Sequence, residues 1–358
     1  MKRTLFVIGT RPEAIKICPI LEEFKNREEK NALLLTTGQH KQMLDIALSD
    51  FGIDADFSFD VMRVGQTLGE LTGRLLFELE RAFDRIAPER VVVHGDTLTA
   101  LCAAIIAFYK RIEVAHVEAG LRSDNINEPF PEEFDRRAIS IIASMHFAPT
   151  RLARKALIEE GVSKHKIFVT GNTVTDALFL TQKCLFDLPI GLSERFAILT
   201  VHRRENLPLL SDILHSVAEA AELSGLDILY PVHKNPQVVK SVNEALRGFG
   251  KIILTDPLSV REFHFYLRRC AFVITDSGGV QEEAAFLGKP IILLRNTTER
   301  KELLSYKGLK IVGTDKTSIN KAIISMAEKC QRENHGRKIR PMGHRGASVK
   351  IADILSEI

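Results

Sequence analysis

The sequence predicts an α/β protein made of two Rossmann-like domains facing a cleft, each with a parallel sheet covered by helices. Short apolar runs alternate with longer amphipathic segments along most of the chain, which is the pattern of parallel strands buried on both faces and joined by helices. The 358 residues are about twice the length of a usual single domain. Residues 171–193 are rich in turn formers and indicate the connection between the two halves.

The predicted elements follow in order along the chain. Strands are expected at Thr4–Ile8, Leu33–Thr36, Arg90–Val93 and Val114–His116, and then at Ile167–Val169, Ala197–Thr200, Asp227–Tyr230, Ile252–Leu254, Phe272–Thr275 and Pro290–Leu294. We place an N-terminal domain at residues 1–171, a C-terminal domain at 172–345 and a final helix at 346–358. Ligands of open parallel sheets bind beyond the carboxyl ends of the strands, so the residues after each strand are the candidates for function.

Composition argues against several classes of function. The chain is 45% hydrophobic and 27% charged with a formal net charge of +3, which is typical of an enzyme and too small a charge to indicate a nucleic-acid or membrane surface. The five cysteines are scattered without a CxxC pair, which indicates buried free thiols in a reducing compartment. The apolar run Leu5–Ile8 is too short for a signal peptide, and no stretch approaches the roughly 18 apolar residues of a membrane span. We therefore expect a cytoplasmic protein.

The first turn after a strand carries basic side chains. It reads Gly9-Thr10-Arg11-Pro12-Glu13-Ala14-Ile15-Lys16, in which glycine permits close approach of a ligand and proline suits the first turn of a helix. Arg11, at a helix N-terminus, and Lys16 form a candidate anion clamp. The segment matches neither a dinucleotide-binding glycine loop nor a Walker loop, so nothing here supports NAD or ATP. A solvated helix start is the alternative.

Acidic residues follow two neighbouring strands of the first half. Asp96 comes directly after one strand and Glu118 after the next, while Glu132 opens a predicted helix behind two prolines. Burying a carboxylate is costly unless it is used or capped. Three carboxylates in one water-poor site would raise one another's pKa, so that an acid and a base coexist near neutral pH. The alternative is that each acid only caps a helix.

The second half contributes histidines and a glycine-rich turn. His202 and His233 each follow a strand. Two histidines in such positions on one sheet edge favour contact with a ligand, and their spacing does not suggest a metal site. The strongest motif is Ser277-Gly278-Gly279 between a strand and a helix, whose backbone N–H groups suit a diphosphate. Glu283 lies one helical turn further on, within reach of ribose hydroxyls, and Arg300 supplies another cation.

These motifs resemble, in order, those of the bacterial non-hydrolysing UDP-N-acetylglucosamine 2-epimerases. The resemblance covers nearly the whole chain and is carried by Gly9 to Lys16, His94-Gly95-Asp96, His116 to Arg122, Pro131-Glu132-Glu133, His202 to Asn206, Asp276 to Glu283 and Thr297 to Arg300. It implies a glycosyltransferase-B architecture, a homodimer, and cofactor-independent, reversible conversion of UDP-N-acetylglucosamine to UDP-N-acetylmannosamine. It also implies that the helix Ala347–Ile358 returns to the N-terminal domain.

The resemblance further implies roles for individual residues. The reacting sugar would be surrounded by Asp96, Glu118, Glu132 and His202, with Arg136 supporting Glu132. The diphosphate would be held by Arg11, Lys16, Ser277, Gly278, Gly279 and Arg300, the ribose by Glu283 and the uracil by Phe263. A second, regulatory molecule of UDP-N-acetylglucosamine would bind Gln39, Gln42, Gln66, Arg203 and His233.

The implied reaction eliminates UDP to give 2-acetamidoglucal and re-adds it after protonation of the other face. It needs a carboxylate base, a second acid/base and cations at the departing UDP, and it needs water to be excluded. We favour Asp96 and Glu132 as the working pair. The product would serve the synthesis of bacterial surface polysaccharides.

The sequence departs from the family pattern at Gly65, Lys301 and Arg345, where relatives often have arginine, proline and an acid. Four alternatives stay open at this point. They are a hydrolysing 2-epimerase that releases N-acetylmannosamine and UDP, a 2-epimerase of another UDP-2-acetamido sugar, a glycosyltransferase of the same architecture, and a non-catalytic sensor of UDP-sugars.

Overall fold

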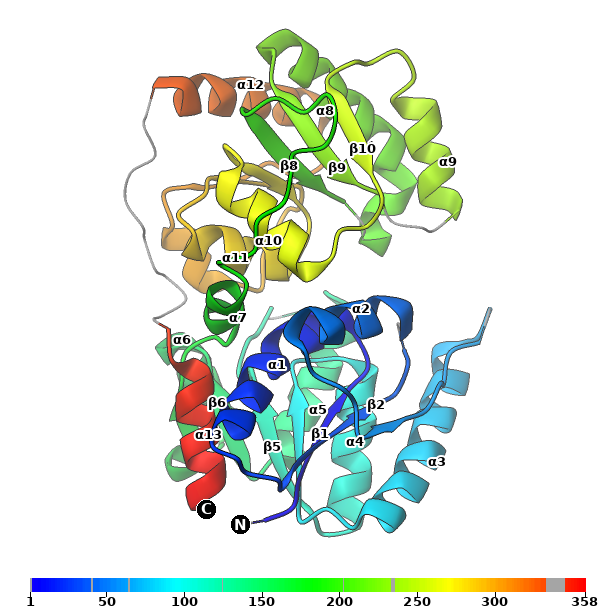
Figure 1. The fold of residues 1–358 in the computed structure, drawn as a ribbon, viewed down its shortest axis with the longest axis vertical. Helices are drawn as coiled ribbons and strands as arrows, with labels where there is room; N and C mark the ends of the chain where they lie inside the picture. The colour runs from blue at the N-terminus through cyan, green and yellow to red at the C-terminus, as the bar shows by residue number, and fades with distance from the viewer. Residues whose placement is uncertain are drawn as a thin grey trace. The chain divides into compact units, whose positions relative to one another are not determined.

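The computed structural model describes residues 2–39, 41–63, 65–123, 125–201, 203–232, 236–332 and 345–358. Its contacts divide the chain into two compact units. The first comprises Met1–Leu180 with Gly343–Ile358, and the second comprises Thr181–Met342. Each unit has one parallel sheet with helices on both faces (Figure 1).

The sheet of the first unit has seven described strands in the order β3-β2-β1-β4-β5-β6-β7. In chain order the strands are β1 (Thr4–Ile8), β2 (Ala32–Thr36), β3 (Phe57–Ser58), β4 (Arg90–His94), β5 (Glu113–Val117), β6 (Met145–Ala148) and β7 (Ile167–Val169). The helices are α1 (Arg11–Asn26), α2 (Lys41–Phe51), α3 (Leu68–Ile86), α4 (Leu98–Tyr109), α5 (Glu132–Ile142), α6 (Arg151–Glu159), α7 (Val174–Leu180) and α13 (Ala347–Glu357), with a 3-10 turn at Lys164–Lys166.

The two faces of this sheet are covered by different helices. Leu5 and Val7 of β1 face the apolar sides of α3, α4 and α5 in one buried cluster. Phe6 points the other way, toward Phe24 of α1, with ring centroids 5.9 Å apart. This follows from the alternation of side chains along a strand, and it explains why the apolar run is continuous: both faces are buried.

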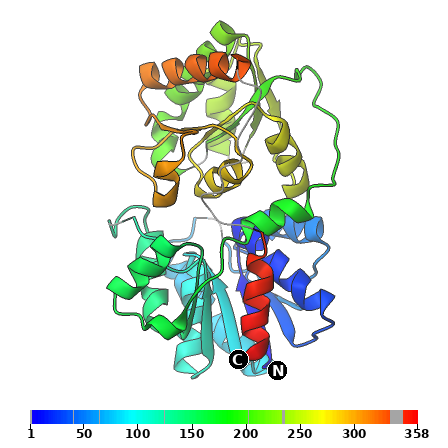
Figure 2. The same ribbon diagram turned by 90° about the vertical axis from the view of Figure 1, so that its left-hand side faces the viewer.

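The C-terminal helix returns to the first unit, as predicted. Figure 2 shows α13 beside α1, with the two chain ends close together. Asp176 of α7 caps this helix by accepting from Gly346 N at 2.7 Å and Ser348 N at 2.8 Å, and the fully buried Arg90 donates to Leu355 O at 2.5 Å. Because α7 packs on α1 and α13, the first unit extends past residue 171, where the sequence placed the domain boundary.

The sheet of the second unit has six described strands in the order β10-β9-β8-β11-β12-β13. In chain order they are β8 (Phe196–Thr200), β9 (Asp227–Pro231), β10 (Ile252–Thr255), β11 (Val273–Thr275), β12 (Ile291–Leu293) and β13 (Leu309–Ile311). The helices are α8 (Leu210–Ser224), α9 (Pro236–Ala245), α10 (Val260–Arg269), α11 (Gly278–Phe286) and α12 (Lys316–Arg332), with 3-10 turns at Arg204–Leu209 and Lys301–Ser305.

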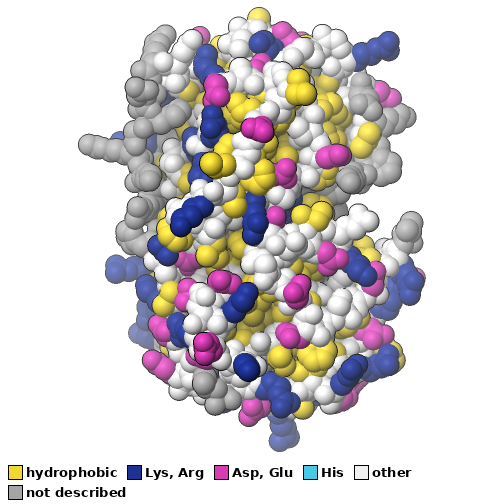
Figure 3. All heavy atoms as spheres, viewed as in Figure 1, with side chains coloured by type: hydrophobic (Ala, Val, Ile, Leu, Met, Phe, Trp, Pro, Cys, Tyr) yellow, Lys and Arg dark blue, Asp and Glu magenta, His cyan; other side chains and the backbone are white. Residues whose placement is uncertain are grey.

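This second sheet is also buried on both faces. Ala197 and Leu199 belong to an apolar cluster with α8 and α12, whereas Phe196 and Ile198 belong to a second cluster with α10 and α11. On the face drawn in Figure 3, charged side chains of both signs are interspersed, in keeping with the small net charge of the chain. No helix among the described residues has the length and apolarity that crossing a membrane requires.

Every strand predicted from the sequence overlaps an observed strand. The strands that the sequence did not indicate are β3, β6 and β13, which have two, four and three residues. β3 and β13 are edge strands, and so few residues give little periodicity to detect.

Candidate active site

Three turns of the first unit gather at the carboxyl ends of adjacent strands. The chain leaves the sheet edge at β3 and continues at β4, beside β1, so β1 and β4 flank the point where the strand order reverses. This is where open α/β sheets bind ligands. The turns that follow β1, β4 and β5 carry Arg11, Asp96 and Glu118.

Lys16 and Glu118 form a buried ion pair. The ammonium of Lys16 contacts Glu118 Oε2, and the two side chains are only 5% and 8% exposed. His94 Nε2 lies 3.7 Å from the same oxygen. Glu118 has a φ of 63°, a left-handed conformation that is costly for a residue with a side chain and that recurs at functional sites. Lys16, a predicted diphosphate ligand, and Glu118, a predicted acid at the sugar, are thus each other's partners in this conformation.

Asp96 and Arg136 form a second ion pair. The guanidinium of Arg136, 4% exposed, contacts Asp96 Oδ2, and its NH1 lies 3.5 Å from Glu133 Oε2. Arg136 therefore has partners on the β4 turn and on its own helix. Glu132 is the first residue of α5, where the helix dipole favours a negative charge; the predicted support of Glu132 by Arg136 stays a prediction.

Asp135 is a buried carboxyl that the sequence analysis did not single out. Its side chain lies in α5 and the residue is 2% exposed. Burial, followed by the charges of Asp96 and Glu132, raises the pKa of Asp135 to about 7, although Arg136 opposes the shift. The signal was in the sequence, because Asp135 follows Glu132 by three residues, the spacing that places two side chains on one face of a helix.

Glu13 is a second carboxyl that sequence reasoning missed. It is 1% exposed and accepts hydrogen bonds from Gly9 N at 3.0 Å and Thr10 N at 2.8 Å. Burial raises the pKa of Glu13 to about 7, against the opposing effect of these hydrogen bonds. Two backbone donors of the β1 turn are thus occupied by a side chain of the protein itself. The anion clamp of Arg11 and Lys16 stays a prediction, and these two N–H groups are not available to it.

The second unit repeats the arrangement at β8 and β11, which flank its own reversal of strand order. Asp276 follows β11, is fully buried, and accepts from Arg203 N and Asn206 Nδ2 at 3.0 Å each. Asp276 thereby ties the β8 turn to the β11 turn. Ser277, the N-cap of α11, makes no side-chain capping bond. The first N–H groups of a helix lack intrahelical partners, and with the dipole they suit an anion.

A buried network of charges stands beside this turn. Arg300 Nε donates to Glu282 Oε1 at 2.7 Å, and Arg300 NH1 donates to Glu299 Oε1 at 3.2 Å. Glu299 also accepts from Arg295 at 2.7 Å and Arg203 at 3.3 Å. Burial alone would raise the pKa of Glu299, but the three guanidinium groups outweigh it and hold this pKa well below its usual range. The network fixes Arg300, a predicted diphosphate ligand.

The predicted nucleoside ligands lie in the same unit. Glu283 of α11 is 4% exposed, and its Oε1 lies 3.7 Å from His264 Nε2. The other nitrogen of His264 bonds with Thr181 Oγ1 at 2.7 Å. Phe263 is 8% exposed and belongs to the apolar cluster under α10 and α11, so most of its ring packs on the protein.

The predicted regulatory residues are distributed over both units. Gln39 Oε1 accepts from Thr99 Oγ1 at 3.0 Å, Gln42 is exposed on α2, and Gln66 Oε1 accepts from Arg74 and from Arg63 N. Arg203 lies in the second unit, on the Glu299 network. His202 and His233 lie outside the described residues.

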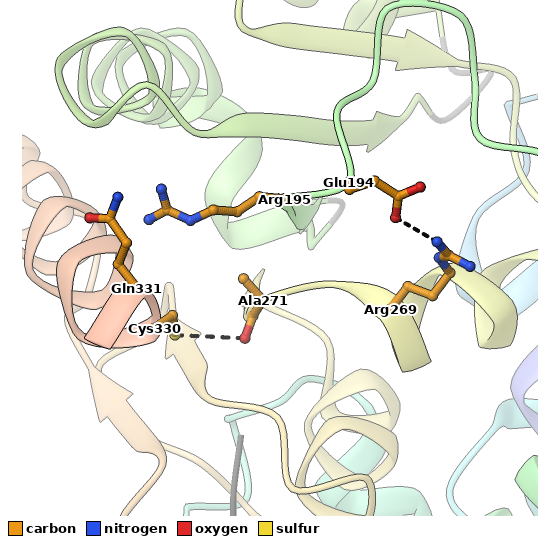
Figure 4. A pocket seen from close by; sticks show the side chains of 6 residues that line it. All are labelled: Glu194, Arg195, Arg269, Ala271, Cys330 and Gln331. Atoms are coloured by element: carbon orange, nitrogen blue, oxygen red, sulfur yellow. Dashed lines mark hydrogen bonds and ion pairs between the residues drawn. The ribbon is translucent and has the colours of Figure 1, made fainter. Parts of the chain in front are cut away.

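One surface hollow of the second unit lies away from the predicted site residues. Its walls are the side chains drawn in Figure 4, where Arg269 pairs with Glu194 at 2.5 Å. Glu194 and Arg195 precede β8, and Ala271 precedes β11, so the hollow is at the amino ends of the strands. That is the edge opposite to the one where such sheets bind ligands.

Comparison with known proteins decides the family. The model of the family described as UDP-N-acetylglucosamine 2-epimerase matches residues 22–356. This chain belongs to the UDP-N-acetylglucosamine 2-epimerase family. Within the family, it is 40% identical to the UDP-N-acetylglucosamine 2-epimerase of Campylobacter jejuni over 99% of this chain and 97% of that protein. It is 42% identical to the enzyme of the same name from Bacillus subtilis over 88% and 85% of the two chains.

Solved structures of family members have the same fold. The UDP-GlcNAc 2-epimerase of Neisseria meningitidis bound to UDP-GlcNAc matches with a TM-score of 0.90 and 34% identity, over 99% of this chain and 100% of that chain. S. aureus MnaA with UDP matches with a TM-score of 0.92 and 35% identity, over 100% and 96%. The predicted architecture of two parallel sheets with flanking helices, the glycosyltransferase-B class, is confirmed.

Proposed function

We propose that the protein catalyses the reversible epimerisation of UDP-N-acetylglucosamine to UDP-N-acetylmannosamine at carbon 2, without hydrolysis. Family membership supports the substrate class. The observation that carries the chemistry is that two carboxylates each meet a cation at the ends of neighbouring strands: Glu118 in a buried pair with Lys16, and Asp96 in a partly exposed pair with Arg136. A carboxylate held at such a position can act as a general base toward a C–H bond of the substrate.

The proposed reaction breaks two bonds and remakes them. A carboxylate takes the proton from C2 while the bond between C1 and the UDP oxygen breaks, which leaves 2-acetamidoglucal with a C1–C2 double bond. An acid then protonates the opposite face of C2 as the UDP oxygen bonds to C1 again. We assign the proton transfers to Asp96 and Glu132, with Glu118 nearby and with His202 at the sugar. Asp135, with a pKa near neutrality, adds a carboxyl that can hold a proton there.

The leaving diphosphate needs positive charge and N–H donors as negative charge develops on it. We assign this role to the Ser277-Gly278-Gly279 turn and to Arg300, with Arg11 and Lys16 as further cations. Glu283 would bind the ribose and Phe263 would flank the uracil. The support for Arg300 is that Glu282 and Glu299 hold its guanidinium at 2.7 and 3.2 Å.

An NMR experiment in heavy water tests the proposal. Purified protein is incubated with UDP-N-acetylglucosamine, and we expect UDP-N-acetylmannosamine to form with deuterium at C2 of both epimers. Asp96→Asn should lower the rate by about 100-fold or more. Asp84→Asn is the matched control, since Asp84 pairs with Lys110 on the surface and is 66% exposed. Free N-acetylmannosamine and UDP as the products would instead identify a hydrolysing enzyme.

We also propose that UDP-N-acetylglucosamine regulates the enzyme through Gln39, Gln42, Gln66, Arg203 and His233. UDP-N-acetylmannosamine supplied alone should then turn over slowly, and a trace of the other epimer should accelerate it. Simple hyperbolic kinetics from the manno epimer alone would contradict this regulation. The proposal includes a homodimer, which light scattering of the purified protein would detect. It also includes a cytoplasmic location, which suits the free cysteines Cys18, Cys102, Cys184, Cys270 and Cys330, since thiols stay reduced in such a compartment.

A further inference from the structure

The carboxylate of Glu13 joins two turns that follow neighbouring strands. Its Oε2 accepts from Gly9 N at 3.0 Å and from Thr10 N and Thr10 Oγ1 at 2.8 Å each, all in the turn after β1. Its Oε1 accepts from Thr97 Oγ1 at 2.8 Å, in the turn after β4. Glu13 therefore does more than cap its own helix, because its second oxygen reaches the turn after another strand.

The hydroxyl of Thr97 makes one hydrogen bond to each side, donating to Glu13 and accepting from its own helix. Thr97 is the N-cap of α4, and its hydroxyl oxygen accepts from Ala100 N at 3.1 Å. The one hydroxyl proton is therefore available to Glu13. A continuous set of hydrogen bonds thus runs from the backbone of α4, through Thr97, to the backbone of the β1 turn.

The joined turns carry the proposed reactive groups. Asp96 directly precedes Thr97, and Arg11 directly follows Thr10. The turns are also in close steric contact, since a Cβ on Gly9 would lie 2.4 Å from Thr99 Oγ1 on α4. A shift of one turn relative to the other would strain the hydrogen bonds to Glu13. Glu13 is 1% exposed, and losing a partner is costly for a polar group so deeply buried.

We propose that Glu13 is a positioning residue for the epimerisation, holding the Asp96 turn in register with the Arg11 turn through Thr97. This inference rests on the proposed function, because Asp96 is taken as a proton-transferring group. Misplacing such a group by about 1 Å can lower a rate on the order of 100-fold. The role assigned to Glu13 is exerted through its hydrogen bonds to the two turns.

The sharpest test removes the hydroxyl of Thr97 and compares this variant with one that removes the hydroxyl of a matched threonine. Thr150 is also a threonine N-cap, accepting from Ala153 N at 3.0 Å at the start of α6, which follows β6 on the same sheet. Thr97→Val should lower kcat by roughly 10- to 100-fold and leave KM within a factor of about three. Thr150→Val should cost a similar loss of Tm without changing kcat, and Thr97→Ser should restore the wild-type rate.

Variants of Glu13 provide an independent readout. Glu13→Gln keeps an acceptor for the β1 turn and can donate its amide N–H to Thr97, so it should retain far more activity than Glu13→Met, which keeps the shape without polar atoms. Combining Glu13→Met with Thr97→Val should cost little more than Glu13→Met alone, because both remove the same link. Additive losses in the double variant would overturn the proposal.

The outcomes separate this inference from the proposed function. Wild-type protein that incorporates no deuterium from heavy water defeats the proposed function itself. Active wild-type protein in which Thr97→Val and Thr150→Val have equal kcat values leaves the function standing and removes the positioning role of Glu13.

Discussion

At the scale of single residues, burial decides how a carboxyl group behaves. Asp135 and Glu13 are both almost completely buried, and burial is the largest cause of the raised pKa of each, to about 7. The side chain of Glu118 is 8% exposed, and the ammonium of Lys16 lies against it. The partners of these carboxyl groups thus differ: Glu118 has a cation against it, whereas Glu13 accepts hydrogen bonds from neutral groups.

Asp135 gives a prediction for stability against pH. Its folded pKa of about 7 exceeds the ordinary value of 3.8, so the folded state binds the proton more tightly than the unfolded chain. Its contribution to stability is full below about pH 4 and is lost as pH rises through about 7. In the wild type the free energy of unfolding should therefore fall between pH 4 and pH 8. Asp135→Asn should make this fall smaller by on the order of 1 kcal/mol or more, as measured by urea denaturation at the two pH values.

The control for this prediction is Asp315→Asn. The hydrogen bond from Ser318 N lowers the pKa of Asp315, so its contribution is present above the ordinary value and is lost only in more acidic solution. The slope between pH 5 and 8 should be that of the wild type. Glu13 contributes a fall of the same sign as Asp135, so some slope should survive in Asp135→Asn. Equal slopes for wild type and Asp135→Asn would refute the assignment.

At the scale of elements, the start of α11 shows how closely a helix and a charge network can approach. A Cβ on Gly278 would lie 2.8 Å from Glu299 Oε1 and 3.3 Å from Arg300 Cζ. Glu299 cannot retreat cheaply, because it accepts from Arg295, Arg203 and Arg300. Glycine at 278 is therefore a packing requirement as well as a suitable residue beside a phosphate.

Adjacent glycines make this a matched comparison. Gly278→Ala should destabilise the protein by roughly 1–3 kcal/mol, because overpacking displaces buried groups. Gly279→Ala has no atom within 4 Å of the added Cβ, so it should be neutral or stabilise by up to about 1 kcal/mol through lower entropy of the unfolded chain. The measurement is the midpoint and slope of urea unfolding. Equal destabilisation by both alanines would contradict the packing argument.

At the scale of the whole molecule, the last helix completes the first unit. Asp176 accepts from Gly346 N, Ser348 N and Ser348 Oγ at 2.7, 2.8 and 2.9 Å, and it is the described cap that fixes the start of α13. Residues far apart in sequence thus share one compact unit, and α13 contributes Ile351 and Leu355 to buried apolar surface.

Removing this cap should loosen α13. Asp176→Ala should cost on the order of 2 kcal/mol, because the N–H groups at the start of α13 lose their side-chain acceptor, and amide hydrogen exchange in α13 should accelerate. Asp353→Ala is the control on the same helix. Asp353 pairs with Arg27 at 2.7 Å but its side chain is 51% exposed, and surface pairs contribute about 0–1 kcal/mol. Unchanged exchange in Asp176→Ala would exclude this docking role.

The sequence by itself determined the strands and the turns that end them. Runs such as Val91–Val93 are buried on both faces, and that burial is legible as continuous apolarity. Asp96, Glu118 and Ser277 could be named as candidates because parallel strands present their carboxyl ends at one edge. Family membership followed from motifs of several residues, which no periodicity alone would give.

Only the tertiary structure decided which side chains meet. Lys16 pairs with Glu118 across 102 positions, Asp96 pairs with Arg136 across 40, and Glu13 reaches Thr97 across 84. Such distances are set by the order of strands in the sheet and by the packing of helices on it, neither of which is written in local sequence. The shifted pKa values of Asp135 and Glu13 have the same origin, because desolvation depends on everything that surrounds a group.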